Sequence, residues 1–83
     1  MSYFPVFVQL EGKQCLVVGG GGVALRKIQT LCEMGASVTV VAPQICPEIQ
    51  AKPVEICRRE FEERDLKDRF LVVAATDEEK INA

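Results

Sequence analysis

The chain has 83 residues, of which 48% are hydrophobic and 27% are charged, and its formal net charge is −2. That length allows one domain, which would bury only about 60–65% of the surface that its unfolded chain exposes and would be marginally stable alone. The acidic balance and the lack of a basic cluster argue against nucleic acid as a partner, and no apolar run reaches the length of a membrane span.

The four cysteines form no C-x-x-C pair, and the chain has no histidine, so the pattern does not predict a zinc site or another metal centre. Cys15 and Cys57 fall in apolar strand-like runs and Cys32 on a predicted helix, so we expect buried, reduced thiols. Reduced cysteines favour a cytoplasmic protein. The N-terminus also lacks the basic start and long apolar core of a signal peptide.

The chain opens with an apolar stretch whose residues 7–10 predict either a short edge strand or a packed extended arm. Glu11-Gly12-Lys13 then signals a turn. The first long strand is predicted over 13–18, because a continuous apolar run is typical of a parallel strand that is covered on both faces.

Four consecutive glycines, residues 19–22, separate this strand from a helix predicted over 23–34, and Gly35 would end that helix. Apolar residues recur in the helix at three- and four-residue spacing, which places them on one buried stripe. They are Ala24, Ile28, Leu31 and Cys32.

Gly19, Gly21 and Ala24 have the G-x-G-x-x-G/A spacing of a dinucleotide-binding fingerprint, and they stand between a predicted strand and a predicted helix. Gly19 would allow the turn out of the strand, Gly21 would let a pyrophosphate approach the backbone, and Ala24 would let the helix pack closely. The N–H groups and dipole of the helix start would favour the phosphate charge. The alternative is a turn that only needs positive φ, although four glycines exceed that need.

Residues 37–41 are β-branched and predict a second parallel strand, which completes a right-handed βαβ unit. Pro43 and Gln44 follow its end, where the adenosine ribose lies in nucleotide-binding folds. An acid often holds the ribose 2′-hydroxyl there, but none occurs between Ser37 and Pro47. Gln44 or backbone groups would have to replace it, so the motif alone does not separate NAD from NADP.

The next stretch contains one helical turn over 47–50, with Pro47 at its first position, and an alternating third strand over 54–57. Residues 58–69 carry many charges of both signs. We interpret them as a solvated face or a short helix near Asp65 rather than as a binding patch.

A fourth strand is predicted over 70–75, and Thr76 with Glu79 fits the capping box of a following helix. The four strands predict an α/β fold, a Rossmann-like, partial doubly wound parallel sheet in the order 3-2-1-4. A complete dinucleotide-binding fold has more strands. We therefore expect residues 1–83 to be one NAD-binding domain of a longer, C-terminally truncated enzyme, with an open sheet edge at 70–75.

The residues also resemble a known family. The chain is similar to the N-terminal region of precorrin-2 dehydrogenases, the NAD-dependent part of siroheme synthases. The resemblance runs through nearly the whole chain, in Phe4-Pro5-Val6-Phe7, Leu16-Val17-Val18-Gly19-Gly20-Gly21, Val23-Ala24-x-Arg26-Lys27, Gly35-Ala36-x-Val38-Thr39-Val40-Val41-Ala42-Pro43, and Leu71-Val72-Val73-Ala74-Ala75-Thr76-Asp77 with Asn82.

The resemblance implies oxidation of precorrin-2, a tetrapyrrole, to sirohydrochlorin in siroheme biosynthesis, with NAD as the hydride acceptor. Many members of the family also insert ferrous iron, and members are typically homodimers. The rival hypothesis is a non-catalytic, dinucleotide-sensing regulatory module, which usually carries an acid at the end of the second strand. A third possibility is a fragment that binds nothing.

By the same resemblance, the start of the predicted helix and the ends of the second and fourth strands contact or line the NAD site. With the fingerprint glycines, the predicted cofactor-binding residues are Gly19, Gly21, Gly22, Val23, Pro43, Gln44, Ala75, Thr76 and Asp77. The family often carries a charged residue where this chain has Gly22. No catalytic residue is assigned, because the aspartate that the family uses lies beyond the next strand, so we expect residues 1–83 alone to be inactive.

Overall fold

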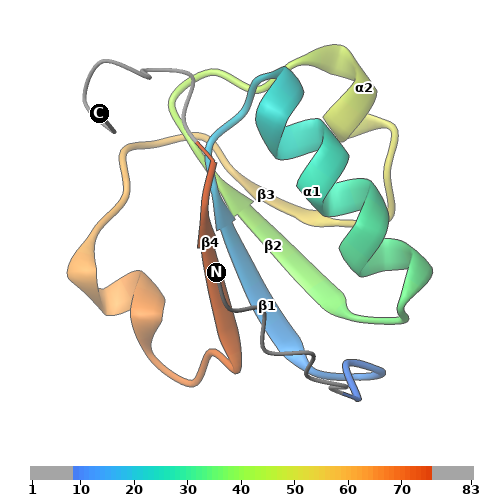
Figure 1. Cartoon of the computed structure of the whole chain (residues 1–83). Helices are drawn as coiled ribbons and strands as arrows, with labels where there is room; N and C mark the ends of the chain where they lie inside the picture. Colours follow the sequence, from blue (N-terminus) through green and yellow to red (C-terminus); the bar gives the residue numbers. More distant parts are fainter. Residues whose placement is uncertain (1–8, 76–83) are drawn as a thin grey trace, which may run out of the picture.

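A computed structural model describes residues 9–75 of the chain, which form a four-stranded sheet with two helices on one face (Figure 1). All neighbouring strands are parallel, and their order is β3-β2-β1-β4. The predicted fold class and strand order are confirmed, and every strand begins and ends within one residue of its predicted range. The strands are β1 (Gln14–Val18), β2 (Ser37–Val41), β3 (Glu55–Cys57) and β4 (Leu71–Ala74).

The helix α1 (Gly22–Glu33) follows the glycines and packs on β1 and β2. Ala24, Ile28 and Leu31 are buried as predicted, whereas Cys32 is only half-buried because it lies at the side of the stripe. Gly35 ends the helix in a Schellman motif with φ of +80°. Its N–H donates to the Cys32 carbonyl at 3.0 Å, and the next N–H donates to the Leu31 carbonyl at 3.1 Å.

Two short helical segments lie where the sequence predicts them. Helix α2 (Pro47–Gln50) starts at Pro47 and buries Ile49 beside α1. The 3₁₀ helix η1 (Glu63–Leu66) lies in the crossover between β3 and β4.

Strand β1 is buried on both faces, as its apolar run predicts. Cys15 and Val17 face the core under α1, and Leu16 is fully buried on the opposite face. Burial raises the pKa of the Cys15 thiol. The prediction of buried cysteines is wrong for Cys32 and Cys57, which are half-buried because they stand at the margins of α1 and of the edge strand β3.

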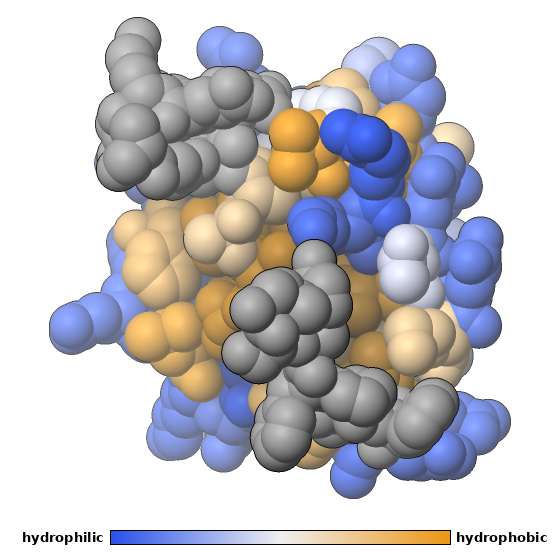
Figure 2. Space-filling view, viewed as in Figure 1, coloured by the Kyte–Doolittle hydropathy of each residue, from blue (hydrophilic) through white to orange (hydrophobic). Residues whose placement is uncertain are grey.

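Strand β4 stands at the edge of the described sheet, and its side chains are much less buried than those of β1. Apolar surface gathers on the left of Figure 2, where β4 and η1 lie. The exposed large apolar residues of this region are Phe61, Leu66, Phe70, Leu71 and Val72.

The crossover carries a side-chain network that the sequence interpretation missed. Asp65 is buried, with 8% of its surface exposed, and accepts two bonds from the Arg59 guanidinium, at 2.6 and 2.9 Å. The Glu62 N–H donates to the same carboxylate at 2.8 Å. The prediction of a solvated charged face is therefore wrong at Asp65, because these donors compensate the burial of its charge.

Arg69 extends this network to the sheet. Its Nε donates to the Asp65 carbonyl and its Nη1 to the Thr39 hydroxyl of β2, both at 3.1 Å. Thr39 in turn donates to Glu55 of β3 at 3.4 Å. We call Arg59, Asp65, Arg69 and Thr39 the crossover network, since together they fasten the β3–β4 crossover to the sheet.

Two sequence predictions lie wholly or partly outside the described residues. The capping box of Thr76 and Glu79 lies outside them, and so do residues 7 and 8 of the predicted arm. Leu10 is buried in the core without belonging to a strand. Within residues 9–75, no helix is both long and apolar enough to cross a membrane.

Candidate functional site

The carboxyl ends of β1, β2 and β4 meet at one edge of the sheet, at the top of Figure 1. The Gly19 N–H donates to the Val41 carbonyl at 3.0 Å, and the Ala75 N–H donates to the Val18 carbonyl at 2.8 Å. From β1 the chain continues to β2 and β3 on one side of the sheet, and it then crosses over to β4 on the other side of β1. The strand order therefore reverses between β1 and β4. Open α/β sheets bind ligands outside the strand ends at such a point.

Gly19 needs to be glycine for two reasons. Its φ is +141°, a conformation that residues with a side chain rarely adopt. A Cβ at this position would also overlap the carbonyl of Ala75. The first fingerprint glycine therefore makes the turn out of β1 and lets the end of β4 approach it.

Gly20 is required as well, although the fingerprint leaves its position free. A Cβ there would overlap the Gln44 carbonyl, and the Gly20 carbonyl accepts a bond from the Cys46 N–H at 2.9 Å. The glycine turn, residues 19–22, is thus clamped between the end of β4 and the loop after β2. A family-specific triple glycine was the only sequence signal for this contact.

The last two glycines of the turn have different roles. Gly21 is the N-cap of α1 with extended backbone, φ −100° and ψ −160°. Gly22 begins the helix, and a Cβ there would meet nothing within 4 Å. Only Gly19 of the four has a positive φ, so the alternative of glycines that serve positive φ alone does not explain the turn.

The start of α1 offers donors for an anion. The first N–H groups of a helix have no acceptor within it, and among residues 9–75 no side chain caps α1. Its first turn carries no acidic residue, and twelve residues give it a substantial dipole. Open space at Gly22 and uncapped amides fit the pyrophosphate of a dinucleotide.

The remaining predicted residues lie around this turn, as far as the structure describes them. Val23 is half-buried at the start of α1, Pro43 and Gln44 are exposed after β2, and Ala75 is buried at the end of β4. Contacts with the turn involve the backbones of Gln44 and Ala75. The predicted residues Thr76 and Asp77 lie outside the described range.

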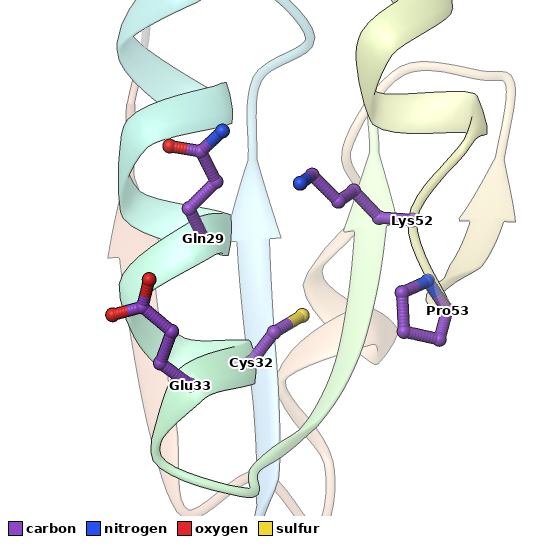
Figure 3. Close-up of a pocket in the computed structure, with 5 residues that line it drawn as sticks. All are labelled: Gln29, Cys32, Glu33, Lys52 and Pro53. Atoms are coloured by element: carbon purple, nitrogen blue, oxygen red, sulfur yellow. The ribbon is translucent and has the colours of Figure 1, made fainter.

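A groove of about 410 Å³ lies elsewhere, between the later half of α1 and the turn after α2 (Figure 3). Lys52 and Gln29 point toward one another across it, and the Cys32 thiol points into it. None of the predicted cofactor residues lines this groove, so it is separate from the candidate site. Its lining residues are Gln29, Cys32, Glu33, Lys52 and Pro53.

The described residues form no candidate metal site. Among them, no three side chains of the His, Cys, Asp and Glu types come together in a way that could hold a metal ion.

A parallel sheet in this order, with a glycine turn that leads into an uncapped helix at the strand ends, defines a Rossmann-like dinucleotide-binding domain. Comparisons with known proteins give the family. Residues 6–83 match the family model described as "Putative NAD(P)-binding". The chain belongs to this family, the NAD(P)-binding domain of siroheme synthases and precorrin-2 dehydrogenases, and the resemblance found in the sequence is confirmed.

The relatives named siroheme synthase match almost the whole chain. The protein from Thioalkalivibrio sulfidiphilus is 50% identical over 86 residues, which cover 99% of this chain and 18% of that protein. The one from Pseudoalteromonas translucida is 44% identical and covers 100% of this chain and 18% of its own length. A solved structure of SirC, a precorrin-2 dehydrogenase, superposes with a TM-score of 0.84 at 38% identity, over 96% of this chain and 42% of SirC. The chain therefore spans about a fifth to two fifths of these relatives.

Proposed function

We propose that this chain is the dinucleotide-binding part of a precorrin-2 dehydrogenase of siroheme biosynthesis, with NAD as the hydride acceptor. The observation that carries the proposal is the glycine turn at the start of α1, held between the end of β4 and the loop after β2, in a chain of which 99% matches part of a siroheme synthase. The tetrapyrrole substrate, the homodimer, the cytoplasmic location and a second, iron-inserting activity belong to the proposal for the longer protein, as the family resemblance implies them.

Different residues around the glycine turn would bind different parts of the dinucleotide. Amides at Gly21, Gly22 and Val23 would hold the pyrophosphate, since they stand at the uncapped start of α1. Pro43 and Gln44 would lie beside the adenosine ribose. Ala75, with Thr76 and Asp77, would line the far side.

The chemistry that NAD supplies when bound is acceptance of a hydride from precorrin-2. The contribution of these residues is position, because fixing two reactants in attack geometry can lower a barrier by about 7–11 kcal/mol. Residues 1–83 offer the nucleotide half of that arrangement. We expect this chain to bind NAD without oxidising precorrin-2, and an anaerobic assay of NADH formation from precorrin-2 and NAD tests that expectation.

A regulatory, dinucleotide-sensing module would share the glycine turn. Such modules usually carry an acid at the end of the second strand, whereas this chain has Ala42-Pro43-Gln44 there. The high identity to siroheme synthases also favours the dehydrogenase.

Calorimetric titration of NAD into the chain and its Gly21→Val variant tests the cofactor site. The φ of −100° at Gly21 is one that valine can adopt, so we expect the variant to keep its helix, as circular dichroism would show. The added side chain occupies the approach to the pyrophosphate, and we expect NAD affinity to fall by at least about tenfold.

The matched control is Gln29→Ala on the exposed middle of α1, which lines the separate groove and should leave NAD affinity unchanged. A folded Gly21→Val variant with full affinity for NAD would show that the pyrophosphate does not approach the turn.

A further inference from the structure

The loop after β2 lies against the middle of the glycine turn. The Cys46 N–H donates to the Gly20 carbonyl at 2.9 Å. A Cβ at Gly20 would overlap the Gln44 carbonyl and would come within 2.9 Å of the Ile45 Cα. Gly20 directly precedes the proposed pyrophosphate-binding amides of residues 21–23, so the placement of those amides depends on this loop.

The loop takes its own position from the core. Ile45 and Ile49 are buried there, with 7% and 0% of their surfaces exposed. Helix α2 lies beside α1 (Figure 1). A helix of four residues is not stable alone, so packing and side-chain bonds must hold the loop and α2 together.

Gln50, the last residue of α2, makes such a bond. Its side-chain Nε2 donates to the Ile45 carbonyl at 3.0 Å. The Ile45 carbonyl and the Cys46 N–H belong to the same peptide group, which is planar. This group accepts from Gln50 on one side and donates to Gly20 on the other, so its rotation would break both bonds.

The bond from Gln50 also affects the strength of the contact with the turn. A peptide group that accepts a hydrogen bond is polarised, and its own N–H becomes a better donor. Gln50 is an exposed polar residue of a one-turn helix and is not among the predicted cofactor-binding residues. Its influence on the turn therefore passes through the peptide group between Ile45 and Cys46.

We propose that Gln50 is a positioning residue for the dinucleotide: it orients this peptide group, which holds the glycine turn ready for the pyrophosphate. Without the bond, the loop and the turn would sample more conformations in the free chain. The nucleotide would then have to order them on binding, which lowers affinity. The inference rests on the proposed cofactor site and adds a residue that acts on it from outside.

The test replaces Gln50 with methionine, which has a similar length and no N–H donor. We expect Gln50→Met to raise the dissociation constant of NAD about three- to tenfold in calorimetric titration, as the loss of one hydrogen bond implies. In NMR spectra of the free chain, the Cys46 amide proton should shift as its bond to Gly20 weakens. The amide proton of Val17, fully buried in the inner strand β1, should not move.

Two control variants separate position from composition and from stability. Gln29→Met makes the same chemical change on the exposed middle of α1 and should leave NAD affinity unchanged. Asp65→Asn should weaken the crossover network and lower stability without changing NAD affinity, because the folded chain keeps its loop after β2.

Three results would count against the inference. If Gln50→Met binds NAD as the unchanged chain does, or if the Cys46 resonance stays in place, Gln50 does not position the turn, and the cofactor site stands. An equal loss of affinity in Asp65→Asn would show a general effect of stability instead of positioning. Failure of the unchanged chain to bind NAD would overturn the proposed function itself, and this inference with it.

Discussion

The glycine turn lies at the carboxyl end of β4 and the crossover network lies before its start, and the two regions are held in place by different kinds of contact. At the carboxyl end of β4, Gly19 and Gly20 contact other segments through backbone atoms alone. Before β4 begins, charged side chains of Arg59, Asp65 and Arg69 do the fastening. The first region therefore depends on the absence of side chains at Gly19 and Gly20, and the second depends on charged side chains. A different change should destabilise each of them.

The largest effect should come from adding one carbon to the turn. In Gly20→Ala the Cβ would overlap the Gln44 carbonyl, and backbone on both sides resists movement. We expect the free energy of unfolding to fall by about 3 kcal/mol, the upper end of the usual cost of overpacking, measured by urea denaturation. If the variant unfolds at the parent's midpoint, the turn does not pack against the β2 loop as described.

A smaller loss should follow removal of the charge in the crossover network. Asp65→Asn replaces an acceptor of two arginine bonds with an amide that can accept fewer of them. We expect a lower urea midpoint than the parent but a higher one than Gly20→Ala. Glu63→Gln, an exposed neighbour in η1, is the control and should leave the midpoint unchanged.

Acid should separate the two regions without any mutation. The Arg59 guanidinium, helped by the Glu62 N–H, holds the pKa of the Asp65 carboxyl well below its ordinary value of 3.8. The stability from this lowered pKa is present above that value and is lost as the pH falls further below it. Urea midpoints of the parent and Asp65→Asn should therefore converge as the pH falls from 7 to 2. A gap of constant size would contradict the ionic role of Asp65.

The smallest effect should be a gain. Gly22 lies within α1 and a Cβ there would enter open space, so Gly22→Ala should stabilise the chain by about 0.5–1 kcal/mol through the entropy of its unfolded state. The same denaturation series measures it. Destabilisation by this substitution would mean that the helix start is more crowded than the structure indicates.

The strand pattern and the helix stripe were predictable because they depend on local sequence: the β-branched run 37–41, the apolar run 13–18 and Gly35 each determine a nearby conformation. The role of Gly19 followed from its position in the fingerprint. The fingerprint did not distinguish Gly20, because glycine is required there only by Gln44, which the packing of the loop brings near.

The crossover network was hidden for the same reason. Residues 58–69 look uniformly charged in sequence, and nothing local marks Asp65 as the carboxylate that becomes buried. Its burial depends on Arg59 reaching it, and the bond from Arg69 to Thr39 joins residues far apart in the chain. The sequence shows which residues of this segment are charged, but their hydrogen-bond partners are determined by the fold.

The pairing of β1 with β4 has a consequence for folding kinetics. It joins Cys15 to Leu71, which lie near opposite ends of the described chain. Contacts of such long sequence separation form slowly, because the loop between them must close first. We therefore expect the candidate site beside the glycine turn, which needs the end of β4, to be completed at a late step of folding. A nucleotide that binds only to the completed site would slow unfolding of the protein while leaving its rate of folding almost unaltered.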